Sequence, residues 1–223
     1  MAAKKLDAYR GPLSPAQIAE GMNAAVRNAR RLLDDAKLLL ENKRFPTATS
    51  VAILAIEEDG KTSLLRYLAL SKADDEIADA WRSYRSHTMK NFAWILPQLA
   101  KQGARKLEDL LPLVDKDSDH PFILDQVKQL GFYTDCLGKA HWSIPIDVVD
   151  ETLAKTIVST AELLVNARSK EYTAKEIELW IEHVGPVWKK GMPWMKKAVV
   201  NWYAAMQAHG LEPEGENQME GFV

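Results

Sequence analysis

Apolar residues recur at helical spacing from the first well-patterned segment onward. Ile18, Met22, Ala25, Ala29, Leu32, Ala36 and Leu39 follow one another at steps of four and three, which is the spacing of one face of an α-helix. Ser14, Pro15 and Gln17 form a capping-box start, with an N-cap hydroxyl and a proline at the first helical position. The pattern predicts a long amphipathic helix that begins after Ser14.

Four more segments carry helical patterns. A second helix is predicted after Pro46, where residues 51–56 are apolar on all sides, as in an enclosed helix. A third is predicted over 74–99, a fourth over 123–137 and a fifth over 146–164, with 101–120 as a connection. The predicted fold is therefore all-α, an antiparallel helical bundle of four to five long helices.

The C-terminal part predicts an additional helical pair. Thr173 and Glu176 form a second capping box, and Pro193 starts another helix. We therefore divide the chain into an N-terminal arm (1–13), the bundle (14–170), a C-terminal helical extension packed on the bundle (171–209) and a flexible acidic tail (210–223).

The composition limits the partners, the disulfides and the cellular location expected for this bundle. The net charge is −2, so a polyanion partner must be recognised by a local patch rather than by the whole surface. The one cysteine, Cys136, excludes an internal disulfide framework and is expected to be a small buried hydrophobe. Charges interrupt every apolar stretch before membrane-spanning length, and the start lacks the apolar core of a signal peptide. We expect a cytoplasmic protein without a membrane partner.

A polar step follows the enclosed apolar run of the second helix. Its residues are Glu57, Glu58, Asp59, Gly60 and Lys61. An ordinary helical ion pair between Glu57 and Lys61, four residues apart, is one explanation. The other is that acidic groups continuing a buried face lie at the mouth of a bundle cavity, where they orient a base or a cation.

The third predicted helix concentrates groups suited to phosphate chemistry. They are Arg82, Arg85, His87, Lys90 and Asn91. Arginine binds phosphate oxygens and imidazole transfers protons near neutral pH. On one helix Arg82 and His87 point about 140° apart, so a shared site needs the reach of arginine, a helix distortion or a second subunit. A solvated polar flank is the alternative.

Two further clusters are weaker candidates. Tyr133, Asp135 and His141 are a possible catalytic group, although packing explains most of that segment. Basic residues alternate with tryptophans near the C-terminus and are candidate RNA contacts, unless the tryptophans are buried and the lysines face solvent; these residues are Lys189, Lys190, Lys196 and Lys197. The histidines and the cysteine show no paired metal-ligand spacing, and Glu-x-x-His is absent, so neither a metal nor a cofactor is expected.

Three stretches resemble AbiV-type abortive infection proteins of the HEPN superfamily. They are ATSVAILAIEEDGKTSLL from Ala48, WRSYRSHTMKN from Trp81 and KQLGFYTDCLGKAHWSIP from Lys128, and the resemblance extends over about residues 15–170. It implies a helical bundle in which an Arg-x4-6-His motif cuts RNA without metal, commonly at a dimer interface. Arg82 and His87 supply Arg-x4-His, with Ser83 after the arginine and Arg85 as a competing arginine. The resemblance also implies an acidic supporting residue on the preceding helix, a role open to Glu57 or Glu58.

The resemblance leads to a functional hypothesis with two alternatives. The hypothesis is a homodimeric phage-defence endoribonuclease in which His87 transfers a proton and Arg82 stabilises the phosphate. The first alternative is a non-catalytic HEPN bundle that binds a phage or antitoxin protein. The second is a helical sensor of a small ligand or nucleotide. A phage protein that activates the chain, or an antitoxin that silences it, is the expected regulatory partner.

Overall fold

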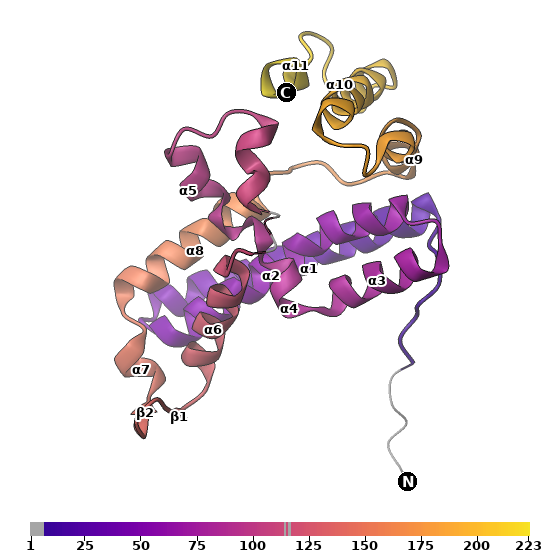
Figure 1. The fold of residues 1–223 in the computed structure, drawn as a ribbon. Coiled ribbons are helices and arrows are strands. Elements are labelled where there is room, and N and C mark those ends of the chain that lie inside the picture. Colours follow the sequence, from indigo (N-terminus) through magenta and orange to yellow (C-terminus); the bar gives the residue numbers. More distant parts are fainter. Residues whose placement is uncertain (1–6, 114, 116) are drawn as a thin grey trace.

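The computed structural model describes residues 7–113, 115 and 117–223 of the chain, and its architecture is all-α, as the sequence predicts (Figure 1). A single short hairpin of two strands, β1 and β2, is present within these residues. The elements in chain order are α1 (Pro15–Glu41), α2 (Phe45–Leu70), α3 (Asp74–Arg85), α4 (His87–Lys90), η1 (Phe92–Ile95), α5 (Leu96–Lys101), η2 (Leu107–Leu113), α6 (His120–Phe132), β1 (Asp135–Leu137), β2 (His141–Ser143), α7 (Pro145–Val148), α8 (Glu151–Val165), α9 (Ala174–Val184), η3 (Gly185–Val187), α10 (Met192–Ala208) and α11 (Gln218–Phe222).

Helices α1 and α2 form a long pair around which the other elements are arranged (Figure 1). The predicted capping box is present at the start of α1, where the Ser14 hydroxyl accepts from Gln17 N–H and the Gln17 side chain accepts from Ser14 N–H. Lys43 adopts a left-handed φ of 58° in the turn that reverses the chain into α2. Local signals therefore define this central pair.

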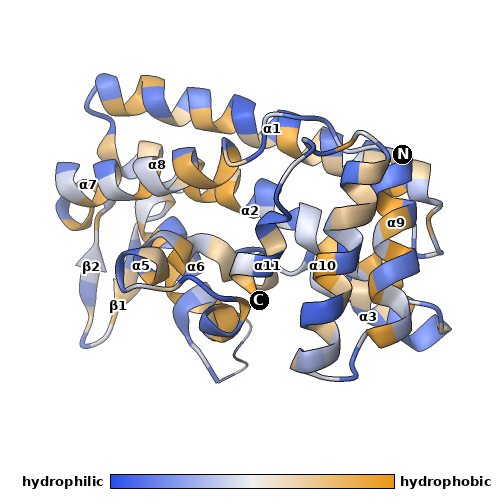
Figure 2. Ribbon diagram, turned by 90° about the horizontal axis from the view of Figure 1, so that it is seen from above, coloured by the Kyte–Doolittle hydropathy of each residue, from blue (hydrophilic) through white to orange (hydrophobic). Residues whose placement is uncertain are grey.

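Two apolar cores lie along the α1–α2 pair. At one end α6 and α8 pack against it, and the buried side chains include Leu33, Ile53 and Ile157. At the other end α3 and α9 pack against it around Met22 and Leu65. Figure 2 shows hydrophobic positions on the facing sides of these helices and hydrophilic positions outside. The middle of α2 therefore lies between two cores.

The C-terminal helical pair is fixed to the bundle by a buried ion-pair cluster. Helix α9 packs against α1 and α2, and α10 packs against α9. Buried Glu176 on α9 accepts from Arg66 of α2 at 2.7 Å and from Arg168 at 2.6 Å. The Arg66 guanidinium also lies over the rings of Trp180 and Trp202. These contacts join residues 171–209 to the bundle.

Several elements differ from the prediction. The third helix is not continuous over 74–99, because Ser86 is extended (φ −75°, ψ 131°) and its hydroxyl caps the new helix α4. The fourth helix ends at Phe132 instead of reaching Leu137, and the chain enters the β1–β2 hairpin, whose turn contains Gly138 at φ 54°. The segment after Gly210 includes the short helix α11, and Asn217 bonds to Val200 O.

No helix in the described parts of the chain combines the length and the apolar character that crossing a membrane requires.

Candidate functional site

The polar step of α2 lies at the junction of the two cores. Ile53 and Ile56 belong to the core at the α6–α8 end, and Leu65 and Leu68 belong to the core at the α3–α9 end. Glu57 is buried between them, with 3% of its surface exposed. A buried carboxylate is costly unless its oxygens are paired, so its partners define the site.

Gly60 allows helix α4 to approach α2 closely. A Cβ at this position would lie 2.1 Å from the backbone oxygen of Lys90, which is far inside any permitted contact. Glycine is therefore required sterically at this point of the polar step, because only its missing side chain leaves room for the α4 backbone. The close approach brings His87 and Lys90 beside Glu57.

His87 and Glu57 form a hydrogen-bonded pair. His87 Nδ1 lies 2.8 Å from Glu57 Oε2, and the bond joins α4 to α2. A carboxylate only accepts, so Nδ1 carries the proton and Nε2 is left as the acceptor in the neutral ring. The His87 side chain is 62% exposed. The ring is thus held at one nitrogen by a buried acid, while most of the side chain is open to solvent.

Two lysines complete the surroundings of Glu57. Lys128 Nζ on α6 lies 2.5 Å from Glu57 Oε1 and 2.7 Å from Asp125 Oδ1. Burial acts to lower the pKa of Lys128, but the hydrogen bonds to Asp125 and Glu57 dominate and raise it above its usual value. Lys90 Nζ lies 3.9 Å from Glu57 Oε2, and burial lowers the pKa of Lys90 although Glu57 opposes the shift. Glu57 therefore accepts from α4 and α6 together.

Glu57, His87 and Asp125 also satisfy the geometry of a metal-ligand group, because their ligand atoms lie within 4.8 Å of one another. The ammonium of Lys128, however, bridges the two carboxylates. A divalent cation would have to displace it and would leave a buried ammonium without its partners. The donor set of this site therefore does not fit a divalent cation while Lys128 bridges the carboxylates.

The other polar residues of the step support α2 and α4 without joining the Glu57–His87 pair. Lys61 binds Glu58 at 2.5 Å, so the first of the two explanations, a Glu57–Lys61 ion pair, is wrong: Glu57 bonds to α4 and α6 instead. Burial raises the pKa of Asp59 to about 6, partly opposed by Arg30. Asn91 is fully buried at the end of α4 and donates to Pro121 O at the start of α6.

The two motif arginines play different parts within the chain. Arg82 on α3 is 77% exposed and pairs with Asp79 at 2.7 Å, and among the described residues it forms no hydrogen bond or ion pair with His87. Arg85 donates to the backbone oxygens of Trp81 and Tyr9 and lies over the Trp81 ring. Because the helix breaks at Ser86, the 140° separation expected on one helix does not apply. Both arginine side chains are exposed, but Arg85 also anchors the N-terminal segment.

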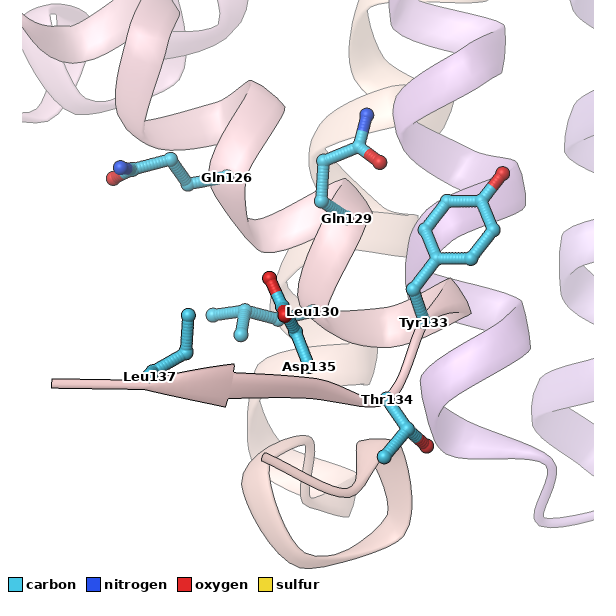
Figure 3. A pocket seen from close by; sticks show the side chains of 7 residues that line it. All are labelled: Gln126, Gln129, Leu130, Tyr133, Thr134, Asp135 and Leu137. Atoms are coloured by element: carbon cyan, nitrogen blue, oxygen red, sulfur yellow. The ribbon is translucent and has the colours of Figure 1, made fainter. Parts of the chain in front are cut away.

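The hairpin cluster lies away from His87 and is open to solvent. Tyr133 and Asp135 line a groove of about 570 Å³ between α6 and β1 (Figure 3). In the hairpin register Asp135 faces Ser143, and His141 faces Leu137, so Asp135 and His141 are not opposite each other. Cys136 is exposed in β1, as are the other two residues of this strand, which corrects the expectation of a buried side chain.

Two of the four C-terminal lysines are engaged in ion pairs. Lys189 binds Glu76 at 2.8 Å and Lys196 binds Glu108 at 2.6 Å. Within the described residues, neither Lys190 nor Lys197 forms an ion pair. Ion pairing leaves fewer positive charges available to RNA on this segment than the sequence suggests.

Sequence reasoning missed Asp125 and Lys128. A signal was present, because Lys128 occupies a core position of α6, between buried Leu124 and buried Gly131. A lysine on such a stripe indicates a buried acidic partner. The spacing Asp125–Lys128 further indicates a pair on one helix face.

The comparisons agree with this architecture. A family model described as AbiV (HEPN_AbiV) matches residues 17–166, which is more than half of the 223 residues and includes α1 to α8. No curated protein and no solved structure gives a match to the chain. The matched range contains Glu57, His87 and Lys128. The chain therefore belongs to the AbiV family of HEPN proteins.

Proposed function

We propose that this abortive infection HEPN protein is a metal-independent endoribonuclease whose reacting group is His87. The observation that carries the proposal is the orientation of the imidazole: Nδ1 is held by buried Glu57 and the ring is largely exposed. An imidazole oriented by a carboxylate and open to solvent is suited to general acid–base catalysis near neutral pH.

In the proposed reaction His87 Nε2 removes the proton from a ribose 2′-hydroxyl. The 2′ oxygen then attacks the adjacent phosphorus, the bond from phosphorus to the 5′ oxygen breaks, and the proton held by His87 passes to the leaving oxygen. The products are a 2′,3′-cyclic phosphate and a 5′-hydroxyl. Arg82 supplies positive charge to the phosphate oxygens as negative charge develops on them.

The role of Glu57 is that of a positioning residue. Its hydrogen bond fixes the tautomer in which Nε2 is the base, and its charge stabilises the imidazolium that forms. Lys128 and Lys90 in turn compensate the buried carboxylate. Glu57 need not contact RNA in this arrangement.

A cleavage assay tests the proposal. Purified protein is incubated with end-labelled RNA, and the wild-type chain is expected to cut it at an undiminished rate in EDTA. RNA with a 2′-deoxy group at the scissile position should resist cleavage because it lacks the nucleophile. His87→Ala should abolish turnover and keep the fold, since the side chain is mainly exposed.

The two arginines provide a matched comparison in the same assay. Arg82→Ala should reduce cleavage severely with little change in stability, because Arg82 is exposed and, among the described residues, its side chain bonds only to Asp79 of its own helix turn. Arg85→Ala should act mainly by loosening residues 9–11. An essential Arg85 with a dispensable Arg82 would show that the motif assignment is wrong.

One observation favours a second candidate, a non-catalytic bundle that binds a phage or antitoxin protein. Arg82 is paired with Asp79 rather than directed at His87 in the single chain. RNA that remains intact with and without divalent metal, together with capture of a phage protein by the purified chain, would support this candidate. The proposed nuclease is expected to be controlled by such a partner, either an activator or an antitoxin.

A further inference from the structure

The N-terminal arm delivers a third arginine to the helix that carries the motif. Tyr9 packs edge-on against Trp81 at 6.1 Å, and Trp81 Nε1 donates to Gly11 O at 2.9 Å. Arg85 donates to Tyr9 O and thereby closes the attachment. Arg10, between these anchored residues, is held beside α3. Residues 9–11 precede the range that the family model matches.

A depression of about 490 Å³ results at this place. Its lining includes Arg10, Arg82 and Arg85, and it also includes Ser86, the residue directly before His87. Asp79 is the one carboxylate that pairs with any of these arginines in the described part of the chain. Three guanidinium groups with one acidic partner leave an excess of positive charge next to the exposed imidazole.

We propose that this three-arginine pocket binds a phosphate group of the RNA strand adjacent to the one that reacts, and that Arg10 is a substrate-binding residue. Guanidinium groups recognise phosphate oxygens through paired N–H donors and remain charged at all relevant pH values. The pocket lies next to the proposed reacting group along the chain, because its lining includes Ser86, the residue directly before His87. The inference rests on the proposed function and adds a binding residue outside the motif.

Binding is measured by fluorescence anisotropy with labelled single-stranded RNA and the full-length His87→Ala chain, which prevents cleavage. Arg10→Ala is expected to weaken binding about 3- to 10-fold at low salt, as for the loss of one partly exposed phosphate contact. The slope of log affinity against log salt should fall by about 0.7, the value for one contact to a single strand. Arg10→Lys should restore most of the slope and part of the affinity.

Two further variants separate this site from general charge effects. Arg31→Ala removes the same charge from an exposed position of α1, where Arg31 pairs with Asp35, and should leave binding unchanged. Tyr9→Ala keeps every charge but removes the contact with Trp81, so it should reproduce much of the Arg10→Ala defect. Unchanged affinity and salt slope in Arg10→Ala, or equal weakening in Arg31→Ala, would overturn the inference.

The Arg10→Ala binding experiment and the cleavage assay can fail independently of each other. If wild-type protein cuts no RNA while Arg10→Ala lowers the salt slope, the phosphate site stands and the nuclease proposal fails. If RNA is cut at the same rate and bound with the same slope in Arg10→Ala, the nuclease stands and the pocket does not bind. DNA of the same sequence should bind the pocket as tightly as RNA, because both carry the phosphate group. A preference for RNA that disappears in Arg10→Ala would contradict recognition of the phosphate alone.

A separate observation concerns the end of the molecule where α6, the hairpin and α7 lie together (Figure 1). Seven large apolar side chains are exposed there: Phe132, Tyr133, Leu137, Trp142, Ile144, Ile146 and Val148. Together they expose roughly 550–750 Å², taking ~150–200 Å² for a fully exposed large side chain. Monomers rarely expose apolar patches above about 600 Å². A stable interface covers about 800 Å² on each partner, and about 65% of that area is apolar in homodimers.

We infer that a second copy of the chain covers this hairpin end. A twofold interface must match itself, and this surface has both shapes: the groove of Figure 3 and projecting side chains such as Trp142 and Ile146. The groove wall carries Gln126 and Gln129, whose amides both donate and accept and so can bond to their own copies. The surface meets the area and the self-complementarity that a homodimer needs.

Light scattering tests this second inference. The wild-type chain should form a particle of twice 25.1 kDa at micromolar concentration. Ile146→Asp, at a position 76% exposed, should give monomers with an unchanged melting temperature, whereas Leu163→Asp, at a position 62% exposed on α8, should remain dimeric. A monomeric wild-type chain, or a dimer that Ile146→Asp and Trp142→Asp leave intact, would overturn the inference and leave the surface to another protein.

Discussion

Gly60→Ala tests the packing that builds the site. The added methyl would lie 2.1 Å from Lys90 O, and real Cβ atoms essentially never approach closer than 3.0 Å. The α4 backbone must therefore retreat from α2 by at least about 0.9 Å, the difference between these two distances. A carbonyl oxygen of a packed helix cannot rotate away as a flexible side chain can, so the shift moves the whole of α4.

This displacement is large on the scale of the Glu57–His87 bond. That bond is 2.8 Å long and is lost at about 3.5 Å, so a movement of about 0.7 Å along it suffices. Overpacking costs about 1–3 kcal/mol, while alanine is favoured over glycine within a helix by about 1 kcal/mol. We expect a net loss of about 0–2 kcal/mol in the free energy of unfolding. Cleavage should fall by about 100-fold, as for a 1 Å misplacement of a reacting group.

Urea unfolding followed by circular dichroism measures the free energy of unfolding of Gly60→Ala, and an assay with labelled RNA measures its cleavage rate. Gly21→Ala is the matched control, because Gly21 also lies within a long helix but its added methyl would meet only the flexible Leu65 side chain, at 3.3 Å. It should retain cleavage and be equally or more stable. Wild-type cleavage in Gly60→Ala, or the same loss in Gly21→Ala, would refute the argument from close approach.

Three other predictions concern buried charges. Burial raises the pKa of Asp59 from 3.8 to about 6, so between these pH values the folded chain holds a proton that the unfolded chain releases. The free energy of unfolding should therefore fall by up to about 3 kcal/mol as pH rises from about 4 to about 6. Urea titrations of Asp59→Asn should lack this decline. Glu57→Gln should lower the free energy of unfolding by about 2–4 kcal/mol and also lower cleavage, because it leaves the buried Lys128 ammonium without the Glu57 carboxylate. Glu58→Gln should cost under about 1 kcal/mol, because the Glu58–Lys61 pair is partly exposed. Equal losses in the two variants would contradict the difference in burial. Glu176→Ala should cost about 3–5 kcal/mol in urea unfolding because two arginines lose their shared acceptor, and wild-type stability would show that the cluster does not hold α9 to the bundle.

The sequence by itself determined the helical framework of this protein. The capping box at Ser14 and the apolar stripe of α1 are local features, since each depends on residues within one or two helical turns. The all-round apolar run of α2 likewise indicated an enclosed helix, and α2 lies between the two cores. The motif stretches were sufficient to indicate the AbiV family, which the family match confirms.

The tertiary structure decided which of the distant candidate groups meet at the site. Glu57 is 30 residues from His87 and 71 from Lys128, and helical periodicity gives the direction of a side chain but not which distant helix it meets. The pattern over 74–99 also concealed the break at Ser86, because the hydroxyl cap and the close approach to Gly60 outweigh the local preference for a continuous helix. Burial of one carboxylate then selected its partners: once packing removed Glu57 from water, charged groups of α4 and α6 had to converge on it.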